Sequence, residues 1–521
     1  MIKIETLDTT LRDGMQSEAI SFSVNDKLNI LKLLDSLGID FAEVGIPASN
    51  DKDNELFERL STLNLKHTKP VAFSSTCHVK TTPENDEALK AAAYSPCEYV
   101  SIFGKAWLLH VNEILGTTAE ENLRIIKDSI IFLRQKGKKI FFDAEHFFDG
   151  YKNNAEYAKK VIETAVDAGA ERIVLCDTNG GTLPDEVIQI LNNCKGFLPE
   201  KFGVHFHNDC GVAIANTMAA VNTGAVQIQG TLNGIGERCG NANLATLIAN
   251  LQLKKFYDVI SCDCMLRLSG VCRAVAQISN ISTYGLPYIS HTAFSHKAGM
   301  HVDAVMKNPS SFEHIDPETV GNRRNILISE VSGKGALLPI IKEIAPSVEK
   351  NSEVTERVVN RVKALEYKGY QYESARASLE LIILKELGIY RSHFDIERFK
   401  LITEQEGPAT GLSSAFVKVR VGDQYKISAA ESDGPVHALD EALREALYVF
   451  FPELEKVFLT DYKVRVLDTK SATGSTVRVF VETSDGENSW TTVGVSVDVI
   501  EASKQALIDG IEYKLYKGGL K

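Results

Sequence analysis

The sequence predicts an α/β protein built on a (β/α)8 TIM barrel, followed by a helical linker subdomain and a smaller α+β domain. Eight short β-branched or aromatic runs alternate with helical segments in the first half of the chain, which favours parallel strands joined by right-handed crossovers. Eight such units in about 250 residues match the size of a closed barrel. The chain has 521 residues, enough for two or three domains, and strand-like alternation returns near its end.

Each unit of the predicted barrel consists of a strand, a polar or glycine-rich turn and a helix. The expected strands cover residues 2–8, 41–46, 70–75, 99–104, 139–144, 172–177, 203–208 and 226–232. Amphipathic spacing predicts helices at residues 25–38, 120–137 and 156–170, and several of these end at a glycine. A doubly wound open sheet is the alternative, which is disfavoured because no G-x-G-x-x-G turn follows the first strand.

The second half of the chain changes character. Residues 256–285 and 353–388 have helical patterns, residues 286–350 are expected to be irregular, and a linker is expected near residues 403–411. The order strand, strand, helix then occurs twice, with strands at 415–421, 462–468 and 477–483 and helices at 434–450 and 499–515, which predicts an internal repeat. We therefore expect a catalytic barrel over residues 1–270, linker subdomains that contribute to the active site over 271–400, and a C-terminal domain over 401–521.

Composition narrows the class of protein. Hydrophobic residues make up 44% and charged residues 24% of the chain, which are globular values. A net charge of −12 without a basic stripe argues against nucleic acid as a partner. No apolar run is long enough for a membrane span, the N-terminus lacks the apolar core of a signal peptide, and the nine scattered cysteines fit reduced thiols. We expect a cytoplasmic protein that binds neither nucleic acid nor membranes.

Polar residues cluster where most of the expected strands end, which is the end of a barrel that holds its chemistry. They are Asp8, Arg12 and Asp13 after the first strand, Glu43 in the second, Asp143 and Glu145 at the fifth, Asp177, Thr178 and Asn179 at the sixth, and His205, His207, Asn208 and Asp209 at the seventh. This pattern predicts a polar, solvated active-site mouth.

The seventh strand suggests a metal site. His205 and His207 are two residues apart, so their side chains point to the same face, toward the barrel interior. Asp13 can add a carboxylate, because the first, seventh and eighth strands are neighbours in a closed barrel. Two imidazoles and a carboxylate make a facial site with open positions, and such N/O ligands suit Mg, Mn or Zn. On these residues alone, a packed and hydrogen-bonded histidine pair stays open as the alternative.

Three motifs resemble those of a known family. The stretches "DTTLRDG" (8–14), "HFHNDCG" (205–211) and "NGIGERCGN" (233–241) are similar to motifs of the metal-dependent acyl-CoA condensing and lyase enzymes on TIM barrels. That family includes 2-isopropylmalate, homocitrate and citramalate synthases and hydroxymethylglutaryl-CoA lyase. Three more stretches look most like its citramalate-synthase branch: "FDAEHFFDGYKNN" (142–154), "CDTNGGTLP" (176–184) and "IDPETVGNRRN" (315–325). The C-terminal region resembles the regulatory dimerisation domain of the synthases.

The resemblance implies a role for each matching residue. Asp13, His205 and His207 would bind a divalent metal, with Asn241 as a fourth or nearby ligand. Arg12 would hold a 2-oxo acid and stabilise oxyanion charge, and Glu43 would fix the geometry of Arg12. Glu145 and Thr178 would line the 2-oxo acid site.

The resemblance also implies that His301 is a candidate acid–base group. Related synthases often carry a tyrosine between this histidine and the "IDP" stretch. Here the nearest aromatic residue is Phe312, which has no hydroxyl, so His314 or a water would have to replace that group.

The implied reaction is the condensation of acetyl-CoA with pyruvate, followed by thioester hydrolysis to (R)-citramalate and CoA, in isoleucine biosynthesis. The same resemblance implies a homodimer with isoleucine as feedback effector. Two alternatives stay open: a sibling synthase that uses a larger 2-oxo acid, such as 2-oxoisovalerate or 2-oxoglutarate, and a non-catalytic barrel that binds metabolites. The second is disfavoured because Arg12, Asp13 and both histidines are intact.

Overall fold

The computed structural model describes residues 2–18, 20–297, 299–326, 334–349, 351–404, 412–467, 475–486 and 488–518. The chain forms two compact units. The first comprises Met1–Phe294 and Ile315–Arg324, and the second comprises Ser295–His314 and Asn325–Lys521. Of the helices in the described ranges, none combines the length and the apolar character needed to cross a bilayer.

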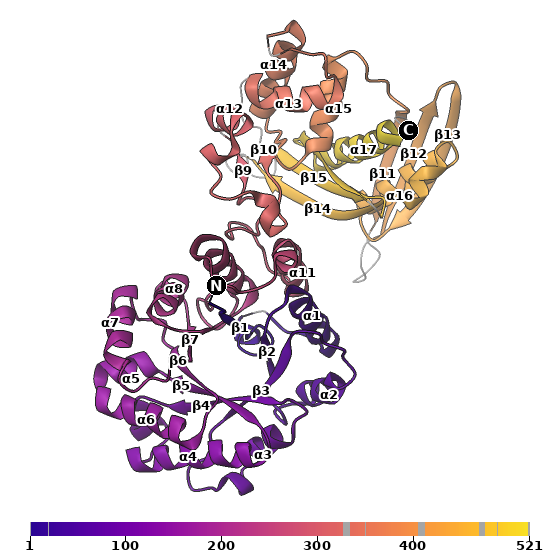
Figure 1. Ribbon diagram of the computed structural model, residues 1–521. Helices are drawn as coiled ribbons and strands as arrows, with labels where there is room; N and C mark the ends of the chain where they lie inside the picture. Colours follow the sequence, from indigo (N-terminus) through magenta and orange to yellow (C-terminus); the bar gives the residue numbers. More distant parts are fainter. Residues whose placement is uncertain are drawn as a thin grey trace. The chain divides into compact units, whose positions relative to one another are not determined.

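The first unit is a closed barrel of parallel strands in the order β1 to β8, with helices around its outside (Figure 1). The strands are β1 (Glu5–Asp8), β2 (Phe41–Gly45), β3 (Lys69–Ser75), β4 (Tyr99–Lys105), β5 (Lys139–Glu145), β6 (Arg172–Asp177), β7 (Phe202–Phe206) and β8 (Gln227–Gly230). The residues of β1 pair with Gln227–Gly230 of β8, which closes the sheet into a barrel. This closure excludes the open doubly wound sheet. The predicted barrel is therefore confirmed.

The helices of this unit follow the strands in sequence. They are α1 (Val24–Leu37), α2 (Asp51–Leu60), α3 (Glu87–Tyr94), α4 (Ala119–Gln135), α5 (Phe147–Asn153), α6 (Ala155–Ala168), α7 (Pro184–Cys194), α8 (Ala213–Thr223), α9 (Leu244–Ala249), α10 (Cys262–Met265) and α11 (Leu268–Ile278). α1 shows how local sequence sets such an element. Ser23 and Asp26 form a capping box at its start, and Gly38 ends it at φ 77°, a left-handed conformation that favours glycine.

An apolar layer crosses the barrel interior below its polar C-terminal end. One buried cluster is formed by inward side chains of β1 to β5, namely Leu7, Phe41, Val71, Tyr99 and Phe141. Inward positions recur every second residue, so the next ones after Phe41 and Phe141 are Glu43 and Asp143, closer to the C-terminal strand ends. An aromatic and aliphatic floor therefore lies beneath a polar mouth.

The second unit begins with helices. They are α12 (Gly299–Lys307), α13 (Lys334–Ile344), α14 (Glu353–Tyr367) and α15 (Arg376–Glu386), and a short parallel pair joins β9 (Ser295–His296) to β10 (Asn325–Ile326). The expectation of an irregular stretch over 286–350 was wrong for α12 and α13. α12 starts at a glycine and α13 contains Pro339, and both residue types normally mark helix ends.

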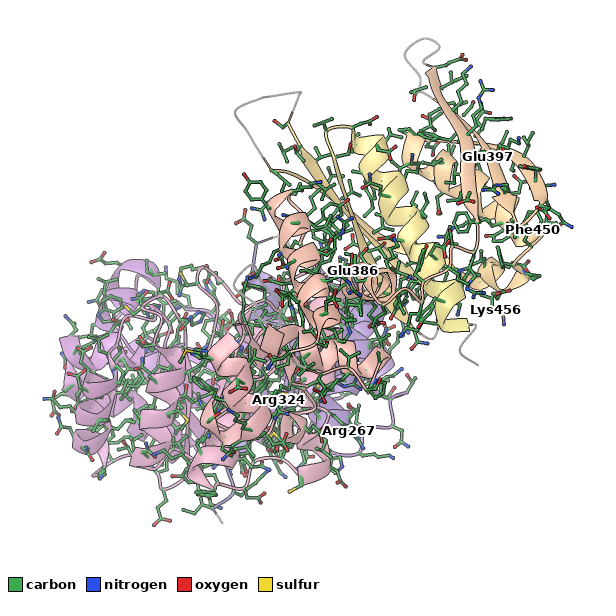
Figure 2. All side chains as sticks on the ribbon, turned by 90° about the horizontal axis from the view of Figure 1, so that it is seen from above. Arg267, Arg324, Glu386, Glu397, Phe450 and Lys456 are labelled. Atoms are coloured by element: carbon green, nitrogen blue, oxygen red, sulfur yellow. The ribbon has the colours of Figure 1, made fainter. Side chains whose placement is uncertain are left out.

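The rest of this unit is the predicted repeat, with one more strand in each half. Its elements are β11 (Asp395–Glu404), β12 (Leu412–Val421), β13 (Gln424–Ser432) and α16 (Pro435–Tyr448), then β14 (Phe458–Val466), β15 (Val477–Ser484), β16 (Ser489–Ser496) and α17 (Val499–Gly518). Each half is an antiparallel three-stranded sheet followed by a helix. In Figure 2, the labelled residue Glu397 lies on β11, and the labelled residue Phe450 lies just after the end of α16. Most of the linker expected at 403–411 lies outside the described residues.

Candidate active site

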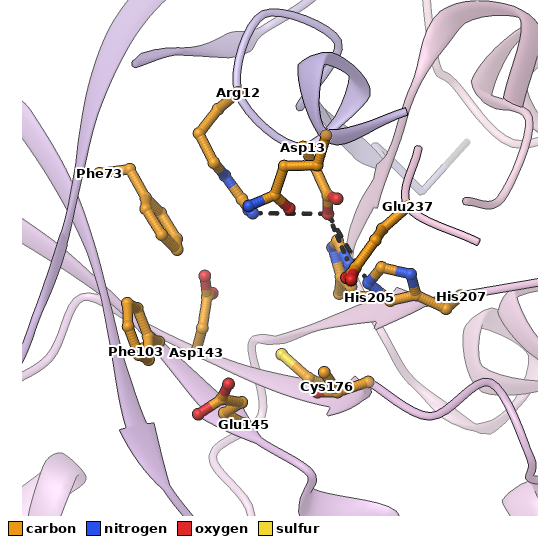
Figure 3. Close-up of a pocket in the computed structure, with 12 residues that line it drawn as sticks. Arg12, Asp13, Phe73, Phe103, Asp143, Glu145, Cys176, His205, His207 and Glu237 are labelled. Carbon is orange, nitrogen blue, oxygen red and sulfur yellow. Dashed lines mark ion pairs between the residues drawn. The ribbon is translucent and has the colours of Figure 1, made fainter. Parts of the chain in front are cut away.

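A cavity of about 220 Å³ lies at the C-terminal ends of the barrel strands (Figure 3). Its lining includes six of the predicted site residues: Arg12, Asp13, Glu145, Thr178, His205 and His207. They come from segments after or within β1, β5, β6 and β7, which lie far apart in the sequence. Barrel closure is what brings them together.

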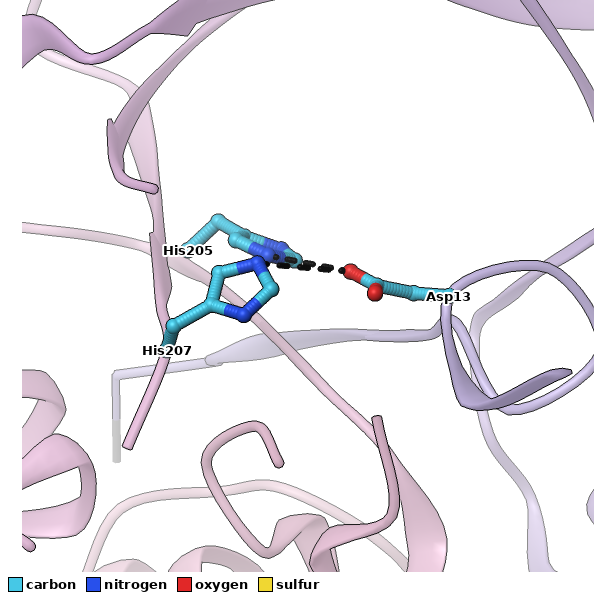
Figure 4. Close-up of side chains that lie close together, drawn as sticks. All are labelled: Asp13, His205 and His207. Atoms are coloured by element: carbon cyan, nitrogen blue, oxygen red, sulfur yellow. Dashed lines mark ion pairs between the residues drawn. The ribbon is translucent and has the colours of Figure 1, made fainter. Parts of the chain in front are cut away.

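Asp13 and the two histidines of the seventh strand converge on one point (Figure 4). The turn that carries Asp13 is held by the Thr9 carbonyl, which accepts a hydrogen bond from the Asp13 backbone N–H at 2.8 Å. Asp13 Oδ2 lies 3.3 Å from His205 Nε2 and 3.7 Å from His207 Nε2. One ligand atom from each of the three residues lies within 4.8 Å of the others, and all three side chains are buried.

Several polar atoms here are left without a partner among the described residues, which fits a cation site. Asp13 Oδ1, His207 Nδ1 and Asn241 Oδ1 are buried and make no hydrogen bond within that part of the chain. Asn241 Nδ2 donates to Asp13 Oδ2 at 2.9 Å, so the Asn241 amide lies beside the three ligands. A side chain at Gly236 would place its Cβ 1.9 Å from Asn241 Oδ1, so the close approach of this loop requires glycine. Buried orphan acceptors are costly unless something pairs with them, and this donor set suits a divalent ion.

The charge states of His207 and Asp13 also suit a cation. Burial and the neighbouring His205 lower the pKa of His207 to about 4, so its imidazole is neutral near pH 7, the form that binds metals. Burial acts to raise the pKa of Asp13, but Arg12 and His205 more than offset this, so the net shift is downward and the carboxylate stays ionised.

Arg12 lies at the edge of the same cavity and is fixed on three sides. Its Nε donates to Glu43 Oε2 at 2.7 Å, and its Nη1 lies 3.5 Å from Asp13 Oδ2. Its guanidinium carbon lies 3.8 Å from the centre of the Phe73 ring, a cation–π distance. Glu43 is fully buried beneath it, so the predicted pairing of Glu43 with Arg12 is present in the structure.

Comparison with known proteins decides the family. The HMGL-like family matches residues 3–275, just over half of the 521 residues. An (R)-citramalate synthase of Geobacter sulfurreducens is 44% identical over 519 residues, which cover 99% of this chain and 98% of the relative. One from Aquifex aeolicus is 43% identical over 518 residues, with the same coverage of both chains. The chain belongs to the (R)-citramalate synthase family.

Matches outside the barrel and to other synthases agree with this assignment. The homocitrate synthase post-HMGL domain-like family matches residues 288–369, and the LeuA allosteric (dimerisation) domain matches residues 373–515. A 2-isopropylmalate synthase of Methanocaldococcus jannaschii is 29% identical over 518 residues, covering 99% of this chain and 95% of its own. It is therefore more distant than the citramalate synthases.

The structure also gives the contacts of three other predicted site residues, Glu145, Thr178 and His301. Glu145 forms an ion pair with Lys105 at the end of the neighbouring strand β4. The Thr178 hydroxyl accepts a hydrogen bond from the His146 backbone N–H at 3.0 Å. His301 belongs to the second unit, where its ring stacks on Phe312 with the ring centres 4.1 Å apart.

Sequence reasoning did not single out Phe73, Phe103 or Gln229 around the cavity, and it named Asp143 at the end of the fifth strand without a role. Phe73 and Phe103 line it as a stacked pair with ring centres 5.4 Å apart, and Asp143 forms part of its wall. Gln229 on β8 lies behind His205, with its Oε1 3.0 Å from His205 Nδ1. The available signal was the two-residue period of inward side chains, which places Phe73, Phe103 and Gln229 inside the barrel once strand faces are assigned.

Proposed function

We propose that this chain condenses acetyl-CoA with pyruvate and hydrolyses the resulting thioester, giving (R)-citramalate and CoA. The observation that supports this best is the convergence of Asp13, His205 and His207 beside Arg12 in one cavity. It occurs in a chain that is 44% identical, over 99% of its length, to an (R)-citramalate synthase.

Asp13, His205 and His207 would hold a divalent cation, Mg, Mn or Zn, with Asn241 as a fourth or nearby ligand. When bound, the cation would polarise the keto carbonyl of a 2-oxo acid that chelates it through its carboxylate and keto oxygens. The N/O donor set is compatible with all three ions. The orphaned Asn241 Oδ1 supports the inclusion of this residue.

Arg12 would supply the positive charge that stabilises the alkoxide formed when the acetyl-CoA enolate attacks the keto carbon. Its Nε is occupied by Glu43, which leaves the terminal nitrogens of the fork for the substrate. Because Glu43 and Phe73 already fix the guanidinium, little reorganisation is needed as charge develops. Glu43 therefore acts through Arg12.

Glu145 and Thr178 would line the 2-oxo acid site opposite the metal ligands. Glu145 contributes a carboxyl group to the cavity wall, and its pair with Lys105 would keep it oriented. His301 stays our candidate for the acid–base group that removes a proton from the acetyl group of acetyl-CoA. Its neighbour Phe312 has no hydroxyl and so cannot take part in that proton transfer.

The apolar part of the cavity wall supports pyruvate as the 2-oxo acid. The stacked Phe73 and Phe103 rings form this part of the wall. The methyl group of pyruvate suits such a wall.

Free-CoA release with a panel of 2-oxo acids and divalent ions tests the proposal. We expect turnover with pyruvate and acetyl-CoA that requires Mg²⁺, Mn²⁺ or Zn²⁺, and a lower kcat/KM for 2-oxoisovalerate and 2-oxoglutarate. A preference for either larger acid would assign the chain to a sibling synthase. Absence of CoA release with every acid and ion would refute a condensing enzyme.

We further propose that the protein is a cytoplasmic homodimer inhibited by isoleucine. The match of residues 373–515 to the LeuA allosteric (dimerisation) domain supports the dimer and an effector, and the nine free cysteines fit the cytoplasm. Light scattering after gel filtration should give about twice the chain mass of 57.3 kDa. Isoleucine should inhibit CoA release, whereas a mass of one chain or equal inhibition by leucine would contradict these proposals.

A further inference from the structure

Gln229 joins the candidate metal ligand His205 to the far side of the barrel. Its Oε1 lies 3.0 Å from His205 Nδ1, and its Nε2 lies 3.4 Å from Asp143 Oδ1. The three side chains come from β8, β7 and β5, so the chain of contacts crosses the barrel interior. Gln229 is 1% exposed, so water does not compete for its amide.

The direction of these hydrogen bonds is set at the Asp143 end. Ser101 Oγ donates to Asp143 Oδ2 at 2.9 Å, and an ionised carboxylate can only accept. The Gln229 amide must then turn its NH₂ group toward Asp143 and its carbonyl oxygen toward His205.

This orientation decides the tautomer of His205. A carbonyl oxygen can only accept, so His205 Nδ1 carries a proton, and in the neutral imidazole, the form that binds metals, His205 Nε2 then holds the lone pair. Nε2 is the atom that lies 3.3 Å from Asp13 Oδ2, on the side of the candidate metal ligands. A metal-binding histidine needs this free nitrogen, and its other N–H needs an acceptor that holds the ring.

We propose that Gln229 is a positioning residue that holds His205 in the tautomer and orientation able to bind the divalent ion. The inference rests on the proposed metal site and adds a residue to it. Gln229 acts on the metal only through His205, since it is separated from the ligand cluster by the imidazole ring.

The neighbouring Gln227 provides a matched control. It precedes Gln229 by two residues on β8, so it points to the same face, and it is fully buried. Neither its Oε1 nor its Nε2 has a hydrogen-bond partner among the described residues. Replacing Gln227 therefore changes a buried amide of the same strand without touching the contacts of His205.

The test measures Mn²⁺ affinity of the full chain by calorimetry at pH 8, for the wild type, Gln229→Met and Gln227→Met. Burial and the nearby Glu43 raise the pKa of Asp143 to about 7, so at pH 8 this carboxyl is ionised. We expect the Kd of Gln229→Met to rise by about 10- to 100-fold. The Kd of Gln227→Met should stay within about twofold of the wild type.

A double variant separates positioning from packing. In Gln229→Glu combined with Asp143→Asn, the carboxylate and the amide exchange places, so His205 Nδ1 again faces an acceptor while volume and net charge are kept. We expect this variant to regain Mn²⁺ affinity to within about threefold of the wild type. An unchanged Kd in Gln229→Met, equal losses in the two methionine variants, or no recovery in the double variant would each overturn the inference. A wild type that binds no Mn²⁺ would instead refute the proposed metal site.

Discussion

Replacement of Arg12 by lysine tests the assignment of this residue to oxyanion stabilisation. Arg12 uses Nε for Glu43 at 2.7 Å and stacks on Phe73 at 3.8 Å, with its terminal nitrogens left at the cavity. A lysine side chain has only one nitrogen, Nζ. If it pairs with the buried Glu43 it cannot also reach the substrate, and it loses the planar contact with Phe73.

The expected cost follows from this geometry. Loss of one preorganised donor to a developing oxyanion lowers kcat by about 10²- to 10³-fold, or about 2.7–4 kcal/mol. Lysine is preferable to glutamine, because glutamine would leave the fully buried Glu43 without a counter-charge, at a cost of about 3–5 kcal/mol in stability. Arg12→Lys therefore isolates the catalytic effect from unfolding.

The assay is CoA release at saturating acetyl-CoA, pyruvate and metal, together with the Kd for Mn²⁺. We expect kcat to fall as stated and the Kd to change by less than about threefold, since Arg12 is not a ligand. Arg59→Lys is a matched control, because Arg59 lies on the surface of the same unit and pairs with Glu55 on its own helix. A fall in kcat of less than about tenfold, or about 1.4 kcal/mol, would refute the role of Arg12.

Four further outcomes can be measured on the same protein. His207→Ala should remove most metal affinity and CoA release, and full turnover without bound metal would exclude the site. Burial raises the pKa of Asp8 from 3.8 to about 7, so the folded chain holds this proton more tightly and stability should fall by about 4 kcal/mol as pH rises from about 4 to 7. Asp8→Asn should flatten that part of the pH dependence in urea unfolding, and an unchanged slope would contradict it. Lys27→Met should cost about 3–5 kcal/mol in thermal unfolding, because it leaves the buried Asp53 without its cation, whereas a loss below about 1 kcal/mol would mean that the pair is not needed. A divalent ion at 100 times its Kd should stabilise the barrel by about 2.7 kcal/mol, an effect that EDTA should reverse and that should be missing in His207→Ala.

Local patterns were sufficient for the barrel and for the centre of its site. The two-residue period places His205 and His207 on one face of a strand, and closure of an eight-stranded barrel makes the first strand a neighbour of the eighth. These two rules bring Asp13 toward the histidines without any knowledge of side-chain contacts.

The same patterns did not give the number of C-terminal strands. Most residues of β11 and β14 are exposed, so apolar and polar residues do not alternate clearly along the whole of either strand. β14 was found only in part, and β11, β13 and β16 were absent from the predicted strands. Alternation appears only where one face of a strand is buried, which accounts for β11 and β14.

By itself the sequence determined the fold of the catalytic half, the candidate metal ligands at its mouth and the family. Only the tertiary structure decided that Arg12 stacks on Phe73, and that His205 is linked through Gln229 to Asp143. These contacts join different strands across the barrel, so they depend on strand register and on the rotamers that close packing selects. Periodicity shows which way a side chain points, and the register between strands determines what it meets.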